Sequence, residues 1–228
     1  MEIRRSKNRG HANHGWLDSY HSFSFASYWD PRYTGFRDLR VINQDSVLPG
    51  QGFGRHPHRN MEIISYVVSG GLDHRDTLGN GSTIRPGEVQ LVSAGSGIAH
   101  SEYNHSADES VEFLQIWVLP REDGGEPGYQ QRDFGREPGS RRLVSPDGRD
   151  NSLQIKQDTE LWRLILPGGQ SAAHEVVRGH VWVQIVRGTL DVNDTRLFSG
   201  DGAAISDVGR LSFDASNGEV EALVFDLA

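Results

Sequence analysis

Short runs of strand-forming residues between turn residues predict an all-β fold for this chain of 228 residues. The apolar runs are rich in Val and Ile, have the length of strands, and are bounded by Gly, Pro, Asp and Asn. Glycine is abundant, at 27 residues, and tight turns need it because it adopts positive φ readily. Many short strands with regular turns are typical of a β-sandwich or barrel. The expected strands include residues 63–68, 89–92, 113–119, 161–166, 181–186 and 222–225.

An internal repeat predicts two barrels in tandem. Leu-Pro-Gly at residues 48–50 recurs at residues 166–168, an offset of 118. The same offset carries Gly-Gly-Leu-Asp at residues 70–73 onto Gly-Thr-Leu-Asp at residues 188–191. Further along, the matching offset shortens to 113, which predicts a shorter hairpin in the second copy. A duplicated barrel explains this pattern.

The segment between the two copies is predicted to be a linker between two domains. Residues 120–151 contain several Pro-Gly and Gly-Gly pairs among alternating charges. A loop of that length is unusual inside one compact domain. We therefore expect an N-terminal domain at residues 1–130, a linker at residues 131–150 and a C-terminal domain at residues 151–228.

Composition excludes several kinds of site and disfavours several partners. The chain has no Cys, which rules out disulfides and thiolate ligands. A net charge of −8 argues against direct binding of nucleic acid, which needs a basic face. No apolar run reaches the roughly 20 residues of a membrane span, and the polar N-terminus lacks the apolar core of a secretion signal. We expect a cytoplasmic protein.

Two motifs with alternating ligand residues predict a metal site. His56-Pro57-His58 and His100-Ser101-Glu102 each place two ligand types two residues apart, so on a strand they face the same side. Imidazole with carboxylate suits Fe, Mn, Ni, Cu or Zn and disfavours Ca and Mg. In a five- or six-coordinate ion, three His and one carboxylate leave positions open for water, oxygen or substrate, and open positions are typical of catalytic metal sites. The sequence predicts one mononuclear transition-metal ion bound by His56, His58, His100 and Glu102.

The second copy lacks this ligand set. His56 maps to His174 at the offset of 118, and the other three positions hold apolar residues. The expected replacements are Val176 for His58, Phe213 for His100 and Ala215 for Glu102, the last two at the offset of 113. The metal is therefore expected in the N-terminal domain alone.

The remaining His and Trp residues carry weaker expectations. His14 and His21 are expected at the surface or in packing, and His74 is expected to be solvated beyond the end of a strand. Trp117 is expected in the core, which is the usual place for a Trp in a strand.

The sequence around the expected ligands resembles the cupin superfamily and, within it, the pirin family. It resembles in particular the bacterial pirin-like quercetin 2,3-dioxygenases. The similarity is dense over residues 16–120 and thinner beyond. The stretches that carry it are SFSFA at residues 22–26, YWDP at 28–31, LRV at 39–41, HPHRNMEI at 56–63 and SAGSGIAHSE at 93–102.

The resemblance implies a bicupin, two jelly-roll-like barrels with one metal in the first. It implies iron(II) or another divalent ion such as Mn, Co, Ni, Cu or Zn. It also implies a dioxygenase that opens small aromatic flavonols such as quercetin with O2 and releases carbon monoxide. In this interpretation Glu102 is also the catalytic base for the substrate hydroxyl.

Three alternatives stay open. Pirins in animals resemble nuclear co-regulators, so a metal-binding regulatory protein without turnover, docked on a transcription factor or enzyme, is the second hypothesis. A cupin isomerase or hydrolase acting on a sugar-like metabolite is the third. Many cupins use the Glu of the first motif as the ligand, which makes Glu62 the alternative to Glu102; otherwise Glu62 is expected to orient a ligand imidazole.

Overall fold

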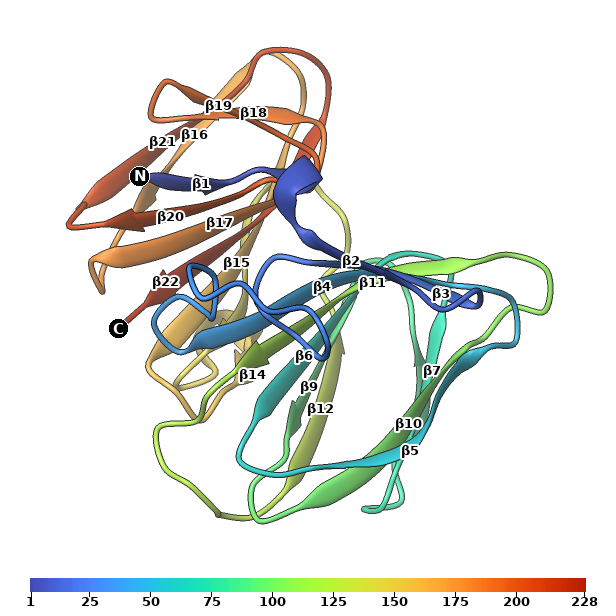
Figure 1. Ribbon diagram of the computed structural model, residues 1–228. Coiled ribbons are helices and arrows are strands. Elements are labelled where there is room, and N and C mark those ends of the chain that lie inside the picture. Colours follow the sequence, from blue (N-terminus) through green and yellow to red (C-terminus); the bar gives the residue numbers. More distant parts are fainter. The chain divides into compact units, whose positions relative to one another are not determined.

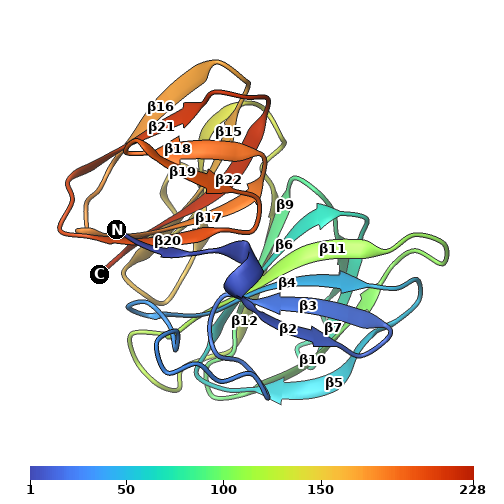
Figure 2. The ribbon, with the colours of Figure 1, turned by 45° about the horizontal axis from the view of Figure 1, so that its top comes forward.

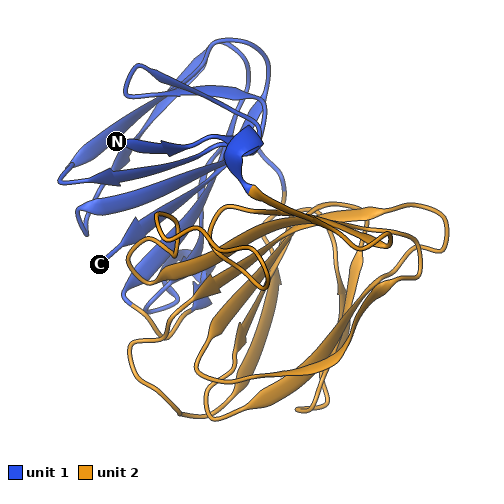
Figure 3. Cartoon of the chain, viewed as in Figure 1, with its two compact units in different colours: residues 1–9, 136–154, 158–228 blue, residues 10–135, 155–157 orange.

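The computed structural model describes residues 1–228 and confirms the all-β prediction (Figure 1). The chain folds into two compact units (Figure 3). The N-terminal unit comprises residues 10–135 and 155–157, and the C-terminal unit comprises residues 1–9, 136–154 and 158–228. No helix in the structure is long and apolar enough to cross a membrane.

Eleven antiparallel strands build the N-terminal unit. They are β2 (Gly10–Asn13), β3 (Leu17–His21), β4 (Leu39–Val47), β5 (Gly52–His58), β6 (Glu62–Ser69), β7 (Leu72–Asp76), β8 (Gly81–Ile84), β9 (Glu88–Ser93), β10 (Ile98–Asn104), β11 (Val111–Val118) and β12 (Gly128–Asp133). A seven-stranded sheet has the order β12-β9-β6-β11-β4-β3-β2, and a four-stranded sheet has the order β5-β10-β7-β8. The two sheets face each other across the barrel interior (Figures 1 and 2).

Apolar side chains fill the interior of the N-terminal unit in two separate clusters. One gathers around Phe113 and Leu72, and the other around Ile63 and Ile98. Each contains residues that are almost fully buried. The core is therefore divided, and buried polar side chains on the same strands lie between the clusters.

The C-terminal unit repeats the two-sheet plan. Its elements are β1 (Glu2–Arg4), the 3-10 turn η1 (Ser6–Asn8), β13 (Gly139–Ser145), the 3-10 turn η2 (Arg149–Asn151), β14 (Leu153–Gln154), β15 (Thr159–Leu166), β16 (Gln170–Glu175), β17 (His180–Arg187), β18 (Thr189–Val192), β19 (Thr195–Phe198), β20 (Gly202–Ser206), β21 (Arg210–Ala215) and β22 (Val220–Leu227). The sheet orders are β1-β20-β17-β22-β15-β13-β14 and β16-β21-β18-β19. One continuous apolar cluster, which includes Leu211, Phe213 and Val224, fills this interior.

The units differ from the expected domain boundaries at three places. Residues 1–9 belong to the C-terminal unit, where β1 pairs with β20 and Arg5 contacts the buried carboxylate of Asp201 at 2.7 Å. The segment expected as a linker contains β13, which pairs with β15. Residues 155–157 join the N-terminal unit. Short polar strands such as β1 have no apolar periodicity, so the sequence pattern does not reveal them.

Strand register supports the repeat in most places and corrects it in one. A β-bulge at Val68 interrupts the pairing of β6 with β11. A bulge at Val186, 118 residues later, interrupts the pairing of β17 with β22 in the same way. His56 pairs with His100, whereas His174 pairs with Leu211. The expected match of Phe213 to His100 was therefore wrong by two residues: Leu211 replaces His100, and Phe213 replaces Glu102. The hairpins of the two copies differ in length, and the sequence offsets did not show at which hairpin the difference lies.

Candidate metal centre

Three imidazoles converge where β5 pairs with β10. His56 lies directly opposite His100, and His58 lies opposite Ile98 at the end of the same ladder. One nitrogen of each His lies within 4.8 Å of the others, and His56 Nε2 is 3.1 Å from His100 Nε2. Two nitrogens bound to one ion at about 2.0–2.1 Å and at right angles would be about 3 Å apart. The spacing therefore matches two ligands of one ion.

A β-bulge and close backbone contact set the orientation of His56. Between His100 and Glu102 the register with β5 shifts by one residue, which leaves an extra residue at Gly54–Arg55. The Gly54 carbonyl accepts a hydrogen bond from His56 Nδ1 at 2.8 Å. Because a carbonyl only accepts, Nδ1 carries the proton, and Nε2 of the neutral ring presents its lone pair to the cluster. Gly52 is required here, since a Cβ would lie 2.2 Å from the Glu102 carbonyl oxygen.

The environment keeps two of the rings neutral. Burial, reinforced by the neighbouring imidazoles, lowers the pKa of His58 to about 4. Burial together with His56 and His74 lowers the pKa of His100 to about 3. Neutral imidazole is the form that binds a metal, so His58 and His100 are in the ligand form at neutral pH.

Glu102 is buried beside these imidazoles and is firmly held. Its side chain is 2% exposed. Oε2 accepts a hydrogen bond from Gln115 Nε2 at 2.8 Å, and Oε1 accepts one from Ser65 Oγ at 3.2 Å. A carboxylate oxygen of Glu102 lies within 4.8 Å of ligand nitrogens of both His74 and His100. The predicted residues thus form two overlapping groups that share His100.

Glu62 lies outside both groups. Its Oε2 accepts hydrogen bonds from Ser93 Oγ at 2.8 Å and from the Lys156 backbone N–H at 3.2 Å. Burial raises the pKa of this carboxyl against the lowering effect of both hydrogen bonds. The expectation that Glu62 orients a ligand imidazole was wrong, because its partners are a hydroxyl and a backbone amide.

His74 lies in the interior of the barrel, although the sequence predicted it to be solvated. It is 1% exposed rather than solvated, and its ring lies 5.2 Å from that of His100. Its Nε2 is 3.1 Å from Asp76 Oδ2. The sequence did contain a signal: His74 and Asp76 are two and four residues after the buried Leu72, so all three alternate onto one face of β7.

The residues present fit a transition-metal ion. The donors are neutral imidazoles and a carboxylate, a combination suited to divalent first-row metals. The His100 Nδ1 and His74 Nδ1 atoms are buried and have no hydrogen-bond partner within the chain. His56 Nε2 and His100 Nε2 lie 3.1 Å apart, a separation that suits a direct N–H···N hydrogen bond in the metal-free protein and two ligands of one ion in the metal-bound protein.

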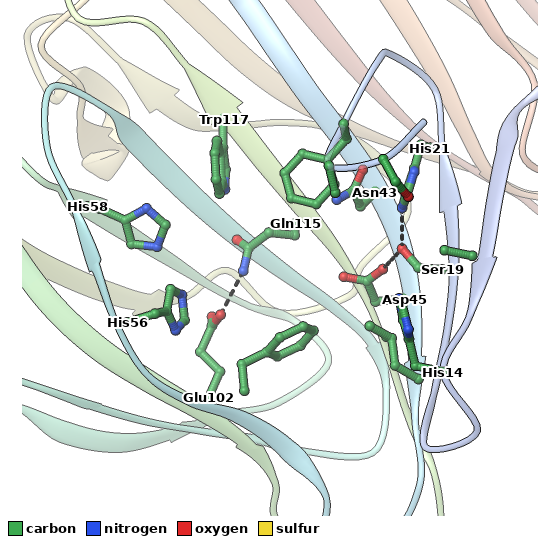
Figure 4. Close-up of a pocket in the computed structure, with 16 residues that line it drawn as sticks. His14, Ser19, His21, Asn43, Asp45, His56, His58, Glu102, Gln115 and Trp117 are labelled. Atoms are coloured by element: carbon green, nitrogen blue, oxygen red, sulfur yellow. Dashed lines mark hydrogen bonds between the residues drawn. The ribbon is translucent and has the colours of Figure 1, made fainter. Parts of the chain in front are cut away.

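A cavity of about 390 Å³ opens beside the imidazoles. His56, His58 and Glu102 lie on one side of it (Figure 4). Most of its lining is apolar, with contributions from Phe53, Phe25 and Trp117. Trp117 was expected in the core, but it borders this cavity and packs edge-on against His58 at 5.1 Å. The volume is in the range of sites for small organic ligands.

Four polar side chains form the other side of the same cavity (Figure 4). They come from β3 and β4, each is at most 4% exposed, and they are Ser19, His21, Asn43 and Asp45. Burial raises the pKa of Asp45 to about 7, although the Ser19 hydrogen bond lowers it. His21 was expected at the surface or in packing, and the other three received no expectation. We call these four residues the polar wall.

The sequence carries a weak signal for the polar wall. Alternation places Ser19 with His21, and Asn43 with Asp45, but polar alternation is equally typical of a solvated face. Only the pairing of β3 with β4 and the closure of the barrel turn these residues inward.

Comparison with known proteins agrees with the fold and with the metal-ligand chemistry. A pirin family model matches residues 2–118, and a model described as a quercetinase C-terminal cupin domain matches residues 142–227. A curated relative named quercetin 2,3-dioxygenase, from Escherichia coli strain K12, is 46% identical and covers 99% of this chain and 97% of its own length. A pirin-like protein of Caulobacter vibrioides is 37% identical, with 96% of each chain covered.

Solved structures give the same result. The crystal structure of bacterial pirin YhhW from Escherichia coli in complex with nickel(II) matches at a TM-score of 0.95 with 46% identity. The match covers 99% of this chain and 98% of that one. Because the match spans both barrels, the fold is a bicupin. The chain belongs to the pirin family.

Proposed function

We propose that this protein is a metal-dependent dioxygenase that opens the ring of flavonols such as quercetin with O2 and releases carbon monoxide. The site is the cavity of the N-terminal unit. The proposal rests chiefly on three imidazoles and a carboxylate that meet beside a mostly apolar cavity. Relatives named quercetin 2,3-dioxygenase support the substrate class.

The ion would be held by His56, His58, His100 and Glu102. Glu102 is preferred to His74 as the fourth ligand because Glu102 lines the cavity with His56 and His58, whereas His74 lines a separate surface hollow. Iron(II) is the ion we propose, since O2 chemistry needs a metal that can share electrons with oxygen. When bound, the ion supplies Lewis-acid and redox chemistry, lowering the pKa of a coordinated hydroxyl group.

Glu102 would act as the base for the flavonol hydroxyl. Gln115 and Ser65 hold its two oxygens from one side, at 2.8 and 3.2 Å, which fixes the carboxylate within reach of the cavity. A positioned carboxylate at hydrogen-bond distance can accept the proton of a hydroxyl group.

The walls of the cavity suit a flat aromatic molecule. Trp117 packs edge-on against Phe25 at 5.4 Å and against His58 at 5.1 Å, so its indole connects the apolar wall to the imidazoles. Aromatic walls bind flat rings through apolar contact and edge or offset stacking. The same walls exclude water from the substrate ring.

The proposal is tested by oxygen uptake with quercetin, using protein loaded separately with iron, manganese, cobalt, nickel, copper and zinc. The His56→Ala variant removes one ligand, and His174→Ala makes the same change at the matching position of the C-terminal unit. We expect uptake with at least one ion, highest with iron, loss in His56→Ala and retention in His174→Ala. Carbon monoxide should be released in equal amount to the oxygen consumed.

Absence of uptake from protein that holds one metal ion per chain would contradict the proposal. The protein would then be a metal-binding regulatory member of the family, and a search for a protein partner would follow. Turnover of a sugar-like metabolite without oxygen would instead favour the isomerase or hydrolase hypothesis. A cytoplasmic location stays a prediction.

A further inference from the structure

We propose that the polar wall is a second recognition site within the cavity, and that it binds hydroxyl groups on the end of the substrate remote from the metal. The substrate class is then an aromatic molecule with hydroxyl donors at both ends. This inference rests on the proposed function for the metal end, but the polar wall is argued from its own contacts.

Strand register makes the polar wall a compact block. Ser19 lies directly opposite Asp45, and His21 lies directly opposite Asn43. Side chains opposite each other on antiparallel strands have Cβ atoms about 4.5–5.5 Å apart, so the four groups can contact one ligand together. Facing them across the cavity are His56, His58 and Glu102 (Figure 4). The remaining neighbours of the cavity are largely apolar.

The hydrogen bonds inside the block run towards Asp45. Ser19 Oγ donates to Asp45 Oδ1, and His21 Nε2 lies 2.8 Å from Ser19 Oγ. Since a hydroxyl has one proton, which goes to Asp45, His21 Nε2 is the donor to Ser19. The order Asp-Ser-His differs from a nucleophilic triad, in which His lies between Ser and Asp. Ser19 thus occupies Asp45 Oδ1 and leaves Oδ2 for a ligand. With a pKa near 7, the Asp45 carboxyl accepts a hydrogen bond from a ligand when ionised and donates one when protonated.

Asn43 supplies the second, independent observation. Its side chain is 3% exposed, lines the cavity, and has an Oδ1 atom without a hydrogen-bond partner. A buried acceptor without a partner costs about 1–3 kcal/mol, so such atoms are rare unless a ligand or water satisfies them. Asn43 and Asp45 alternate on one face of β4. A ligand hydroxyl can donate to Asn43 Oδ1 and can donate to or accept from the Asp45 carboxyl, so hydroxyl groups on an aromatic ring suit both residues.

The test compares two flavonols that differ only at the pendant phenyl ring. Quercetin carries two adjacent hydroxyl groups there, and the second flavonol carries none. Binding is measured by calorimetry without oxygen, on protein loaded with one metal ion. We expect wild-type protein to bind quercetin roughly tenfold to a hundredfold more tightly than the second flavonol. The Asn43→Leu and Asp45→Asn variants should each reduce that ratio, and the double variant should bring it close to one.

Controls separate this inference from the proposed function. Gln44→Leu changes the neighbouring residue of β4, which contacts Glu112 and not the cavity, and it should keep the wild-type ratio. Metal content and melting temperature are measured for every variant, so loss of fold is recognised. A wild-type ratio near one, an unchanged ratio in the double variant, or binding of neither flavonol would overturn the inference. Tight, selective binding without oxygen uptake would retain it while contradicting the dioxygenase.

Discussion

The two barrels pair their strands in the same order, but they differ in one row of interior side chains, that is, in one set of residues paired across four neighbouring strands. The row is polar in one barrel and apolar in the other. In the N-terminal unit the row crosses β4, β11, β6 and β9, and it is polar. In the C-terminal unit the matching row crosses β15, β22, β17 and β20, and it is apolar. The paired residues are Asn43, Gln115, Ser65 and Gln90 in the first row and Trp162, Val224, Val183 and Ala203 in the second.

The difference shows how one barrel can be used in two ways. In the C-terminal unit, Leu211 and Phe213 occupy the positions of His100 and Glu102 and join one continuous core. In the N-terminal unit the polar row supports Glu102 and separates two smaller apolar clusters. Burial of apolar area stabilises a barrel, whereas buried polar groups need partners and specify a site. We infer that the C-terminal barrel serves stability and the N-terminal barrel serves chemistry.

The largest effect is expected from exchanging one residue between the barrels. His100→Leu gives position 100 the residue type of Leu211, which occupies the matching position in the C-terminal unit. The change removes one ligand and leaves a buried apolar group near Glu102. We expect metal content to fall from about one ion per chain to nearly none, because loss even of a group that supports a ligand typically costs tenfold to a hundredfold in affinity. Metal analysis after dialysis measures the change.

His174→Leu is the matched control for that exchange. His174 occupies the position of His56 in the C-terminal unit, where Leu211 faces it. Its metal content should equal that of wild-type protein. Metal retained by His100→Leu would contradict His100 as a ligand, and metal lost from His174→Leu would show that the C-terminal unit takes part in binding.

The next effect concerns stability of the apolar barrel. Phe213 is 1% exposed in the C-terminal core, so Phe213→Ala should lower the free energy of unfolding by about 3–5 kcal/mol. Phe198 lies in the same unit but is 51% exposed, and Phe198→Ala should change that free energy by no more than about 0.5 kcal/mol. Denaturant unfolding of the two variants checks the contrast. Equal losses would contradict a packed C-terminal core.

A somewhat smaller effect separates the two buried glutamates of the N-terminal barrel. Glu102→Gln keeps the size of the side chain but removes the base, so kcat for quercetin should fall by about a hundredfold or more. Glu62→Gln changes a carboxyl that contacts Ser93 and Lys156, and it should reduce kcat by less than about threefold. Metal content is measured for both variants, so that a lost ion is not mistaken for a lost base. The reverse result would make Glu62 the functional carboxylate.

Sequence spacing was enough to place the candidate ligands in two pairs, because local alternation decides which way side chains on a strand face. His56 with His58, and His100 with Glu102, each lie two residues apart, and the strands were identifiable from their composition. The relation between the two motifs needed the resemblance to a family. The sequence also found the repeat, because turn residues such as Gly70 and Gly188 recur at fixed positions.

What the sequence missed depends on contacts between distant strands. The polar wall exists only because β3 pairs with β4 in the register that sets Ser19 against Asp45. Polar alternation alone is equally consistent with a solvated face, and His74 was misplaced for the same reason. The strand β1 carries too few apolar residues to show that it belongs to the C-terminal unit.

The smallest expected effect is a pH dependence confined to the N-terminal barrel. The pKa values of His58 and His100 are lowered to about 4 and about 3, while imidazoles in the unfolded chain keep the ordinary value near 6.5. Between pH 6.5 and 4 the unfolded chain therefore binds more protons than the folded chain. Metal-free protein should lose stability as pH falls through that window, because proton uptake favours the unfolded state.

His58 is half-buried and His100 is 1% exposed. The two lowered pKa values together should cost several degrees in melting temperature across this window. Wild-type protein is compared with a His58→Leu/His100→Leu variant, both free of metal, in steps of pH. The variant lacks both groups and should show a shallower decline. A metal ion competes with protons for the same nitrogens, so metal-loaded wild-type protein should resist acid until the ion is released. A slope that is identical in all three samples would place the acid-sensitive groups elsewhere, with the ion pairs of the C-terminal barrel as the next candidates.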